Sequence, residues 1–328
     1  MKNIQADIKS GNFKQVYLLY GEEAYLKQQY KQNLVKALNP DGDTMNFNHY
    51  EGKGIDVKQL IDLCETIPFF AERRVILLED TGFFKNKCEE LADYMKELPD
   101  YLYLIFAETE VDKRNRMYKA VKACGSIAEF IRQDEKTLMR WAAGLLGKAG
   151  KKITQRDMEL LLTKTGTDMG NLRMELEKLI SYTEGRDVVT AEDIEEICTT
   201  QTTNRIFDMV RAVTEKNQKR ALELYYDLLT LKEPPMRILF LLAKQYRQLL
   251  LAKQFAAAGL AQTEIASKLG VPGFVVRNIT TCARAYTISE LEQAVKDFVD
   301  AEESVKTGRL EDKLSVELLI IKYSSKVK

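Results

Sequence analysis

Short apolar runs alternate with amphipathic segments over the first 130 residues of the chain. A continuous apolar run is typical of a strand buried on both faces of a parallel sheet. Apolar residues at i, i+3, i+4 and i+7 indicate a helix with one buried face. The pattern predicts strands at 16–20, 46–50, 74–80, 101–107 and 126–130, and helices between Gly21 and Leu38, over 57–64 and over 113–122. This alternation predicts an α/β domain with a parallel sheet that ends near residue 140.

From residue 136 onward the pattern is wholly helical. Thr154 and Thr190 are expected to cap helices, Gly166 to end one, and Pro234 to open the longest. Predicted helices cover 138–149, 154–165, 171–179, a segment after 190, 206–216, 220–231 and 234–258, with shorter pieces beyond. We therefore predict an α/β domain over 1–140, a helical module over 141–204 and a second all-α domain over 205–328.

The segment before the third predicted strand holds an adjacent aromatic pair, Phe69 and Phe70, that its helix does not explain. Pro68 argues against continuing that helix, because an interior proline loses a backbone hydrogen bond and clashes with the preceding turn. The pair is therefore expected on a short turn at one end of the sheet. The pattern alone favours rings that fold back into the core, since phenylalanine is usually buried. The alternative is an exposed wedge that binds a protein.

The composition excludes several classes of protein. Among 328 residues, 49 Lys and Arg balance 49 Asp and Glu, so charge alone does not attach the chain to nucleic acid. A single histidine, His49, argues against most imidazole catalysis and every multi-histidine metal site. Five widely spaced cysteines are expected to be small core residues rather than zinc ligands or disulfides. With no transmembrane-length apolar run and no signal peptide, we expect a cytoplasmic protein.

The turn after the first predicted strand has the position of a phosphate-binding loop but lacks its residues. That loop needs G-x-x-x-x-G-K-[ST]. Counted from Gly21, Lys27 takes the lysine position, but Leu26 replaces the second glycine and Gln28 the hydroxyl residue. The acidic pair at 79–80 resembles the end of a Walker B strand only in part, and a solvated strand end is the better interpretation. We predict a nucleotide-binding architecture that has lost its nucleotide, with no catalytic residue, cofactor or metal.

Two segments are candidates for nucleic-acid contact. Basic residues crowd the predicted helix over 113–122, which is either a solvated face or a contact for DNA or an acidic partner. Residues 262–277 resemble a helix-turn-helix with Gly270 at the turn. Any helical hairpin has this pattern, so packing is the favoured interpretation. A DNA-binding regulatory protein built on residues 262–277 is the alternative function.

Several short motifs occur in order along the whole chain. They are YLLYGEE at 17–23, PFFAERR at 68–74, DKR at 112–114, ELEKL at 175–179, IFD at 206–208, PPMRIL at 234–239, QYR at 245–247 and KLGVP at 268–272. Each is weak alone, but their order and spacing together resemble the δ subunits of the bacterial DNA polymerase III clamp loader. The resemblance implies an AAA+-like domain without ATPase activity, a helical lid, and a C-terminal collar that assembles into a five-membered ring with related subunits.

By this resemblance the chain binds and opens the sliding clamp, which is then loaded on primed DNA during replication. It implies no enzymatic activity of the subunit itself, although the holoenzyme is a DNA-directed DNA polymerase. It places the clamp-binding wedge on Ile67, Pro68, Phe69 and Phe70, and so favours exposed rings. Implied partners are the clamp (beta), the delta prime and tau/gamma subunits, and primer–template DNA. Candidate DNA contacts are Lys113, Arg114, Arg116, Arg237, Lys244 and Arg247.

Overall fold

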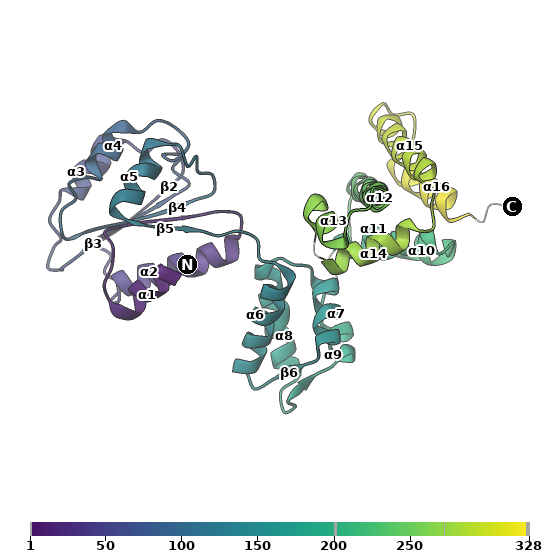
Figure 1. The fold of residues 1–328 in the computed structure, drawn as a ribbon, viewed down its shortest axis with the longest axis horizontal. Helices are drawn as coiled ribbons and strands as arrows, with labels where there is room; N and C mark the ends of the chain where they lie inside the picture. The colour runs from purple at the N-terminus through teal and green to yellow at the C-terminus, as the bar shows by residue number, and fades with distance from the viewer. Residues whose placement is uncertain (1, 200–201, 272, 326–328) are drawn as a thin grey trace. The chain divides into compact units, whose positions relative to one another are not determined.

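The chain divides into two compact units, residues 1–133 and 134–328. The structure, a computed structural model, describes residues 2–199, 202–271 and 273–325. The first unit contains a parallel sheet covered by helices, and the second is almost entirely helical (Figure 1). Within these ranges, no helix has the length and apolar character needed to cross a membrane.

The first unit is built on one sheet of parallel strands in the order β2-β3-β4-β1-β5. The strands are β1 (Val16–Tyr20), β2 (Phe47–Glu51), β3 (Arg74–Glu79), β4 (Leu102–Glu108) and β5 (Ser126–Glu129). β1, β3 and β4 are buried along nearly their whole length, as expected for parallel strands with helices on both faces. All five predicted strands are confirmed, with ends that differ by one residue at most.

Helices cover both faces of this sheet. They are α1 (Lys2–Ser10), α2 (Ala24–Leu38), α3 (Val57–Cys64), α4 (Glu89–Tyr94) and α5 (Arg116–Cys124). α1 and α2 share a core with Leu19 on one face, and α3, α4 and α5 share a core with Leu18 on the other (Figure 1). Successive strand residues thus enter opposite cores. The sequence pattern misses α1 and α4, because α1 buries few apolar residues and α4 is only six residues long.

Two features of the first unit differ from the prediction. α5 begins at Arg116, because Asn115 caps the helix by accepting a hydrogen bond from the Met117 N–H. Lys113 and Arg114 therefore precede the helix that they were predicted to join. Cys124, at the end of α5, is exposed, so the expectation of a core position is wrong there, while the other four cysteines are buried.

The second unit begins with a small helical module. Its elements are α6 (Glu135–Lys148), β6 (Lys152–Ile153), α7 (Gln155–Thr165), α8 (Met169–Tyr182), β7 (Val188–Val189) and α9 (Ala191–Ile197). The predicted caps are confirmed: Thr154 and Thr190 each accept a hydrogen bond from a backbone N–H in the first turn, and Gly166 ends α7. One hydrophobic cluster joins these helices, with Leu146 and Leu176 fully buried in it.

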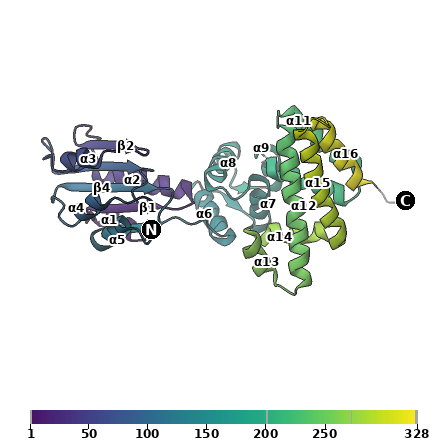
Figure 2. The ribbon, with the colours of Figure 1, turned by 90° about the horizontal axis from the view of Figure 1, so that it is seen from above.

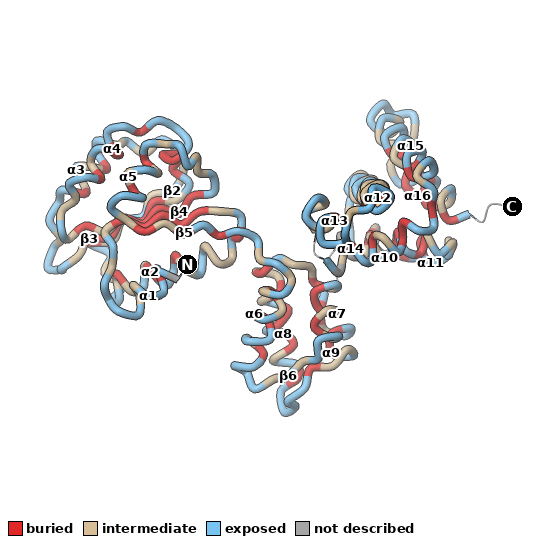
Figure 3. The backbone as a smooth tube through the Cα atoms, viewed as in Figure 1, coloured by how far each residue is buried: buried red, intermediate tan, exposed pale blue. Residues whose placement is uncertain are grey.

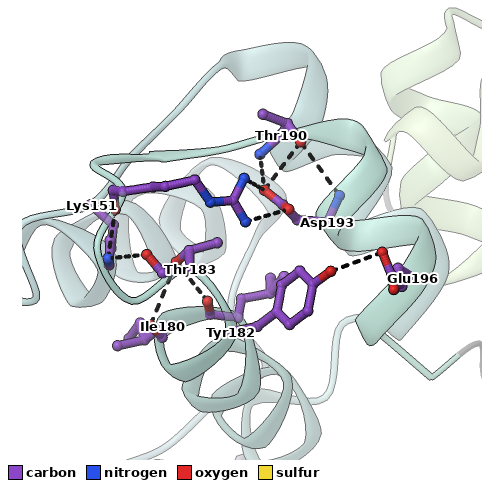
Figure 4. A network of polar contacts seen from close by, with 9 residues as sticks. Lys151, Ile180, Tyr182, Thr183, Thr190, Asp193 and Glu196 are labelled. Atoms are coloured by element: carbon purple, nitrogen blue, oxygen red, sulfur yellow. Dashed lines mark hydrogen bonds and ion pairs between the residues drawn. The ribbon is translucent and has the colours of Figure 1, made fainter.

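A polar network holds the turn between α8 and α9 (Figure 4). The Lys151 Nζ donates to the backbone carbonyls of Thr183 and Arg186, at 2.6 Å each. The Arg186 guanidinium donates in turn to the Asp193 carboxylate at 2.8 Å. Burial opposes ionisation of Asp193, but hydrogen bonds from Arg186 and Thr190 hold its pKa below the ordinary value. Charge-assisted bonds therefore fix this turn together with the apolar packing of Val189, which is fully buried in the same cluster.

The remaining helices share a single larger hydrophobic cluster. They are α10 (Thr202–Thr214), α11 (Gln218–Thr230), α12 (Pro235–Ala257), α13 (Gln262–Leu269), α14 (Gly273–Ala283), α15 (Ile288–Lys306) and α16 (Asp312–Ser324). α12 is the central helix and packs against α14 and α15 (Figure 2). Pro234 immediately precedes α12, as predicted, because proline fits the start of a helix.

The segment that resembles a helix-turn-helix consists of α13 and α14, with Gly270 in the left-handed conformation between them. Pro272, part of the predicted turn, lies outside the described residues. Ile265, Val276 and Ile279 point into the common cluster of the C-terminal helices. This burial supports the packing interpretation of the hairpin.

The predicted division into three domains stays a prediction. α6 spans its first boundary at 140/141, and the first compact unit ends at residue 133. Near the second boundary, at 204/205, the hydrophobic cluster of residues 142–198 gives way to that of 206–320. We take this change of core as support for a separate C-terminal helical domain.

Candidate functional site

The loop between α3 and β3 is mostly exposed (Figure 3), and three of its exposed residues are large and apolar. Ile67 is 75% exposed, Phe69 57% and Phe70 95%. Pro68 beside them is half-buried. The pattern-based expectation that the two rings fold into the core is wrong, and the exposed arrangement implied by the family resemblance is confirmed. We call residues 66–70 the wedge loop.

The two rings of the wedge loop support each other. Their centroids lie 4.5 Å apart and their planes meet at 83°, an edge-to-face contact that aromatic pairs prefer. Phe70 has φ of +50°, in the left-handed region that costs a residue with a Cβ atom about 1–2 kcal/mol. A backbone conformation of this cost persists only where the surroundings hold it.

Two buried polar side chains hold the backbone of the wedge loop. Asn46, only 3% exposed, bonds both backbone groups of Phe69: its Oδ1 accepts from the N–H at 2.7 Å and its Nδ2 donates to the carbonyl at 2.9 Å. Arg74, 5% exposed, donates from Nε to the Thr66 carbonyl at 2.8 Å and from Nη2 to that of Ile67 at 3.4 Å. The exposed rings therefore stand on a fixed support.

Sequence reasoning missed both supporting residues. Asn46 is 23 positions from Phe69, so no local pattern connects them. Arg74 did carry a signal, because a charged residue opens an otherwise apolar strand that is predicted to be buried. A buried charge needs hydrogen-bond partners, and the acceptors nearest in sequence are the backbone carbonyls of the preceding loop.

The loop after β1, at the opposite edge of the sheet, is closed by its own backbone. Gly21 has φ of +122°, and a Cβ atom there would lie 2.3 Å from the Phe130 carbonyl oxygen. The same carbonyl accepts a hydrogen bond from the Glu23 N–H at 2.9 Å, and the Phe130 N–H donates to Tyr20 at 2.7 Å. The turn after β1 is thus packed against, and hydrogen-bonded to, the residue that follows β5.

Lys27, at the position of the P-loop lysine, binds protein atoms. Its Nζ donates to the Glu108 carbonyl at 3.0 Å and reaches the Thr109 hydroxyl at 3.5 Å. Burial lowers the pKa of this ammonium, although nearby carboxylates, that of Asp80 foremost, counteract the effect. Two protein oxygens therefore lie within hydrogen-bonding distance of this ammonium.

The acidic residues at the end of β3 are also engaged. Glu79 forms ion pairs with Lys31 at 2.6 Å and, through its other oxygen, lies 2.9 Å from His49 Nε2. The Asp80 carboxylate accepts a hydrogen bond from the Thr109 N–H at 2.9 Å. The expected solvated strand end is therefore wrong for Glu79, whose side chain is mostly covered by its partners.

The six candidate DNA contacts fall into two sets, three in each compact unit. Lys113, Arg114 and Arg116 pair with Glu129, Asp112 and Asp93 respectively. On α12, Arg237 pairs with Glu233 at 3.2 Å. Lys244 and Arg247 are exposed on the same helix and form no ion pair within the described ranges. Phe240, also on α12, is 62% exposed.

Comparison with known proteins identifies relatives along nearly the whole chain. Residues 17–130 match the family "DNA polymerase III, delta subunit", and residues 203–323 match "DNA polymerase III delta subunit, C-terminal domain". The chain is 26% identical to DNA polymerase III subunit delta of Bacillus subtilis (strain 168), over 97% of this chain and 95% of that protein. It is 20% identical to a protein of Aquifex aeolicus (strain VF5) described as a probable DNA polymerase III subunit delta, over 78% of this chain and 75% of that protein.

The fold is shared with a solved structure, the Bacillus subtilis DNA clamp loader delta protein. The TM-score is 0.69 at 23% identity, and the match covers 99% of both chains. The predicted fold, an α/β domain with a parallel sheet followed by an all-helical part, is thereby confirmed.

Proposed function

Since the chain belongs to the DNA polymerase III delta subunit family, we propose that it is the clamp-loader subunit that binds and opens the sliding clamp. The opened clamp is then loaded on primed DNA during replication. The observation that carries this proposal is the wedge loop, with Phe69 and Phe70 exposed above a buried polar support.

The wedge loop has the properties of a binding hot spot. Burying one phenylalanine side chain stabilises by roughly 1.5 to 3 kcal/mol, so two exposed rings favour a protein partner with a hydrophobic pocket. Truncating a central aromatic anchor in such an interface often costs 2 kcal/mol or more. Ile67 and Pro68 flank the rings and would exclude water from the contact.

Opening follows from a difference in affinity. A closed ring opens when a protein binds its open state better, and the equilibrium shifts only by that difference. The wedge loop would act in this way, without chemistry of its own. ATP would act through sister subunits, because in this chain Lys27 and the loop after Gly21 are occupied by protein atoms.

The other partners follow from membership of the complex. We propose that the C-terminal helices from residue 205 form the collar that assembles with the delta prime and tau/gamma subunits. Primer–template DNA would meet the basic residues of the first unit and of α12. Lys244 and Arg247 are the best placed of these for phosphate contact, since the other four cations already have carboxylate partners. No observation favours the alternative of a DNA-binding regulator, because α13 and α14 use their apolar residues in the helical core.

Calorimetric titration of the full chain with the sliding clamp of the same organism tests the proposal. We expect the wild type to bind, and the variant with Phe69→Ala and Phe70→Ala to lose at least tenfold in affinity, about 1.4 kcal/mol. Phe240→Ala, which removes an exposed ring of α12, is the matched control and should bind as the wild type does. Circular dichroism checks that each variant folds. A folded wild type that does not bind the clamp overturns the proposal.

A further inference from the structure

Asn46 is the side chain on which the shape of the wedge loop depends. It lies just before β2, is almost fully buried, and bonds both backbone groups of Phe69. A primary amide is suited to this task, because it carries a donor and an acceptor side by side, whereas a carboxylate only accepts. The pair of bonds fixes the position and the orientation of the Phe69 peptide groups.

We propose that Asn46 is a positioning residue for clamp binding, which holds the wedge loop in its binding conformation before the clamp is met. The inference rests on the proposed function, since it assumes that the exposed rings are the clamp-binding element. Asn46 would act through Phe69 and Phe70 and would not itself enter the clamp. Holding a loop in its bound conformation increases affinity because less freedom is lost on binding.

The conformation of Phe70 explains why such a support is needed. Its φ of +50° is disfavoured for any residue with a Cβ atom, and its ring is 95% exposed. Packing therefore does not hold it, apart from the edge-to-face contact with Phe69. Fixing the Phe69 peptide on both sides limits the alternatives open to the next residue.

Asn46 is itself held in place by a chain of hydrogen bonds that starts at α2. Asn39 follows the last residue of this helix, and its side chain makes two bonds of 2.9 Å with the backbone of Asp43. The Asp43 carboxylate accepts from the Met45 N–H at 2.8 Å and from the Asn46 Nδ2 at 2.5 Å. These hydrogen bonds orient the amide of Asn46 independently of its contacts with the wedge loop.

The fold does not depend on this side chain alone. The backbone carbonyl of Asn46 accepts a hydrogen bond from the Val75 N–H at 2.9 Å, next to the paired strands β2 and β3. Arg74 continues to bond the carbonyls of Thr66 and Ile67 when the Asn46 amide is absent. Removing the amide is therefore expected to loosen the wedge loop and leave the sheet intact.

The test measures clamp affinity of the full chain in a double-mutant cycle with Asn46→Ala and Phe70→Ala. We expect Asn46→Ala alone to weaken clamp binding at least tenfold while circular dichroism shows that the chain remains folded. In the Phe70→Ala background the same change should cost less than threefold, because the ring that Asn46 positions is gone. Asn33→Ala, at an exposed asparagine of α2, is the matched control and should bind as the wild type does.

A second readout reports the loop directly. Hydrogen exchange of the Phe69 amide should be slow in the wild type and in Asn33→Ala, and fast in Asn46→Ala, since Asn46 Oδ1 is its acceptor. If Asn46→Ala does not fold, Asn46→Ser replaces it. We expect the same loss of clamp affinity and the same fast exchange of the Phe69 amide, because the shorter serine side chain cannot bond both backbone groups of Phe69.

The outcomes separate this inference from the proposed function. Clamp binding by Asn46→Ala at wild-type strength, or an equal loss in both backgrounds, overturns the positioning role while the wedge stands. If Phe70→Ala binds the clamp as tightly as the wild type, the Phe70 ring is not part of the clamp contact and the positioning role falls with it, whereas the proposed function fails only if the wild type itself does not bind the clamp.

Discussion

The wedge loop before β3 and the loop after β1 lie at opposite edges of one parallel sheet. They differ in which side chains they expose to solvent. Before β3, buried polar side chains hold apolar rings out in solvent. After β1, the chain closes on itself, and Lys27, Asp80 and Glu79 all find partners within the protein. The first loop therefore exposes apolar rings, and the polar groups near the second have partners within the protein.

The two loops differ in how they use the two ends of the parallel strands. In open α/β sheets, ligands bind at the carboxyl ends of the strands. In this chain Gly21 packs against the backbone of Phe130 at that edge, while the amino edge carries the exposed rings. Both loops contain a residue with positive φ. In the loop after β1 this residue is Gly21, which has no Cβ atom, whereas in the wedge loop it is Phe70, whose neighbour is held by hydrogen bonds.

The largest expected effect is on stability, at Gly21 in the loop after β1, where there is no space for a side chain. Gly21→Ala should lower the free energy of unfolding of the first unit by at least about 3 kcal/mol, because the new Cβ atom would meet backbone at 2.3 Å and φ is positive. Urea denaturation followed by circular dichroism measures the loss. Gly11→Ala is the matched control: its φ is +73°, but nothing lies within 4 Å, so only the conformational cost of about 1 kcal/mol is expected. Equal losses in the two variants would show that the loop after β1 is not closed as described.

Smaller effects are expected on acidification, because the pKa values of Asp43 and Glu108 are shifted in opposite directions. The Asn46 amide and the Met45 N–H hold the pKa of Asp43, in the support of the wedge loop, below its ordinary value of 3.8. Burial raises the pKa of Glu108, beside the closed loop, above 4.5, although hydrogen bonds from Thr81 and Gly82 counteract it. Carboxyl NMR titration should find both shifts, with Asp43→Asn and Glu108→Gln assigning the signals.

The two shifts have opposite consequences for stability. The contribution of Asp43 is present above pH 3.8 and is lost as the pH falls through its folded pKa. The contribution of Glu108 is present below pH 4.5 and is lost as the pH rises through its folded pKa. Finding both groups shifted in the same direction would remove the contrast between the two loops.

The last prediction is that Mg-ATP has no effect on thermal stability. Mg-ATP at millimolar concentration should leave the thermal midpoint of the isolated chain unchanged, because Lys27 bonds the Glu108 carbonyl and Gly21 packs against the backbone of Phe130. A ligand present at 100 times its Kd would stabilise the fold by about 2.7 kcal/mol, so binding would be easily seen. A shift with Mg-ATP that Lys27→Met abolishes would identify this chain as an active nucleotide-binding subunit.

Most of the fold could be predicted from the sequence, because its signals are local. The five strands follow from apolar runs, and the caps at Thr154 and Thr190 follow from residue type at a fixed spacing. The failures are also local in origin. α1 and α4 bury too few apolar residues to show a period, and the capping role of Asn115 competes with the basic run that suggested an earlier helix start.

The sequence by itself determined the parallel α/β architecture, the missing residues of the phosphate-binding loop and the presence of an aromatic pair before β3. These depend on residue type and on spacings of a few positions. Only the tertiary structure decided that the rings face solvent and that Asn46 and Arg74 hold them there. The physical reason is that hydrogen bonding joins Asn46 to Phe69, 23 positions further along the chain, and their proximity depends on how the strands pair.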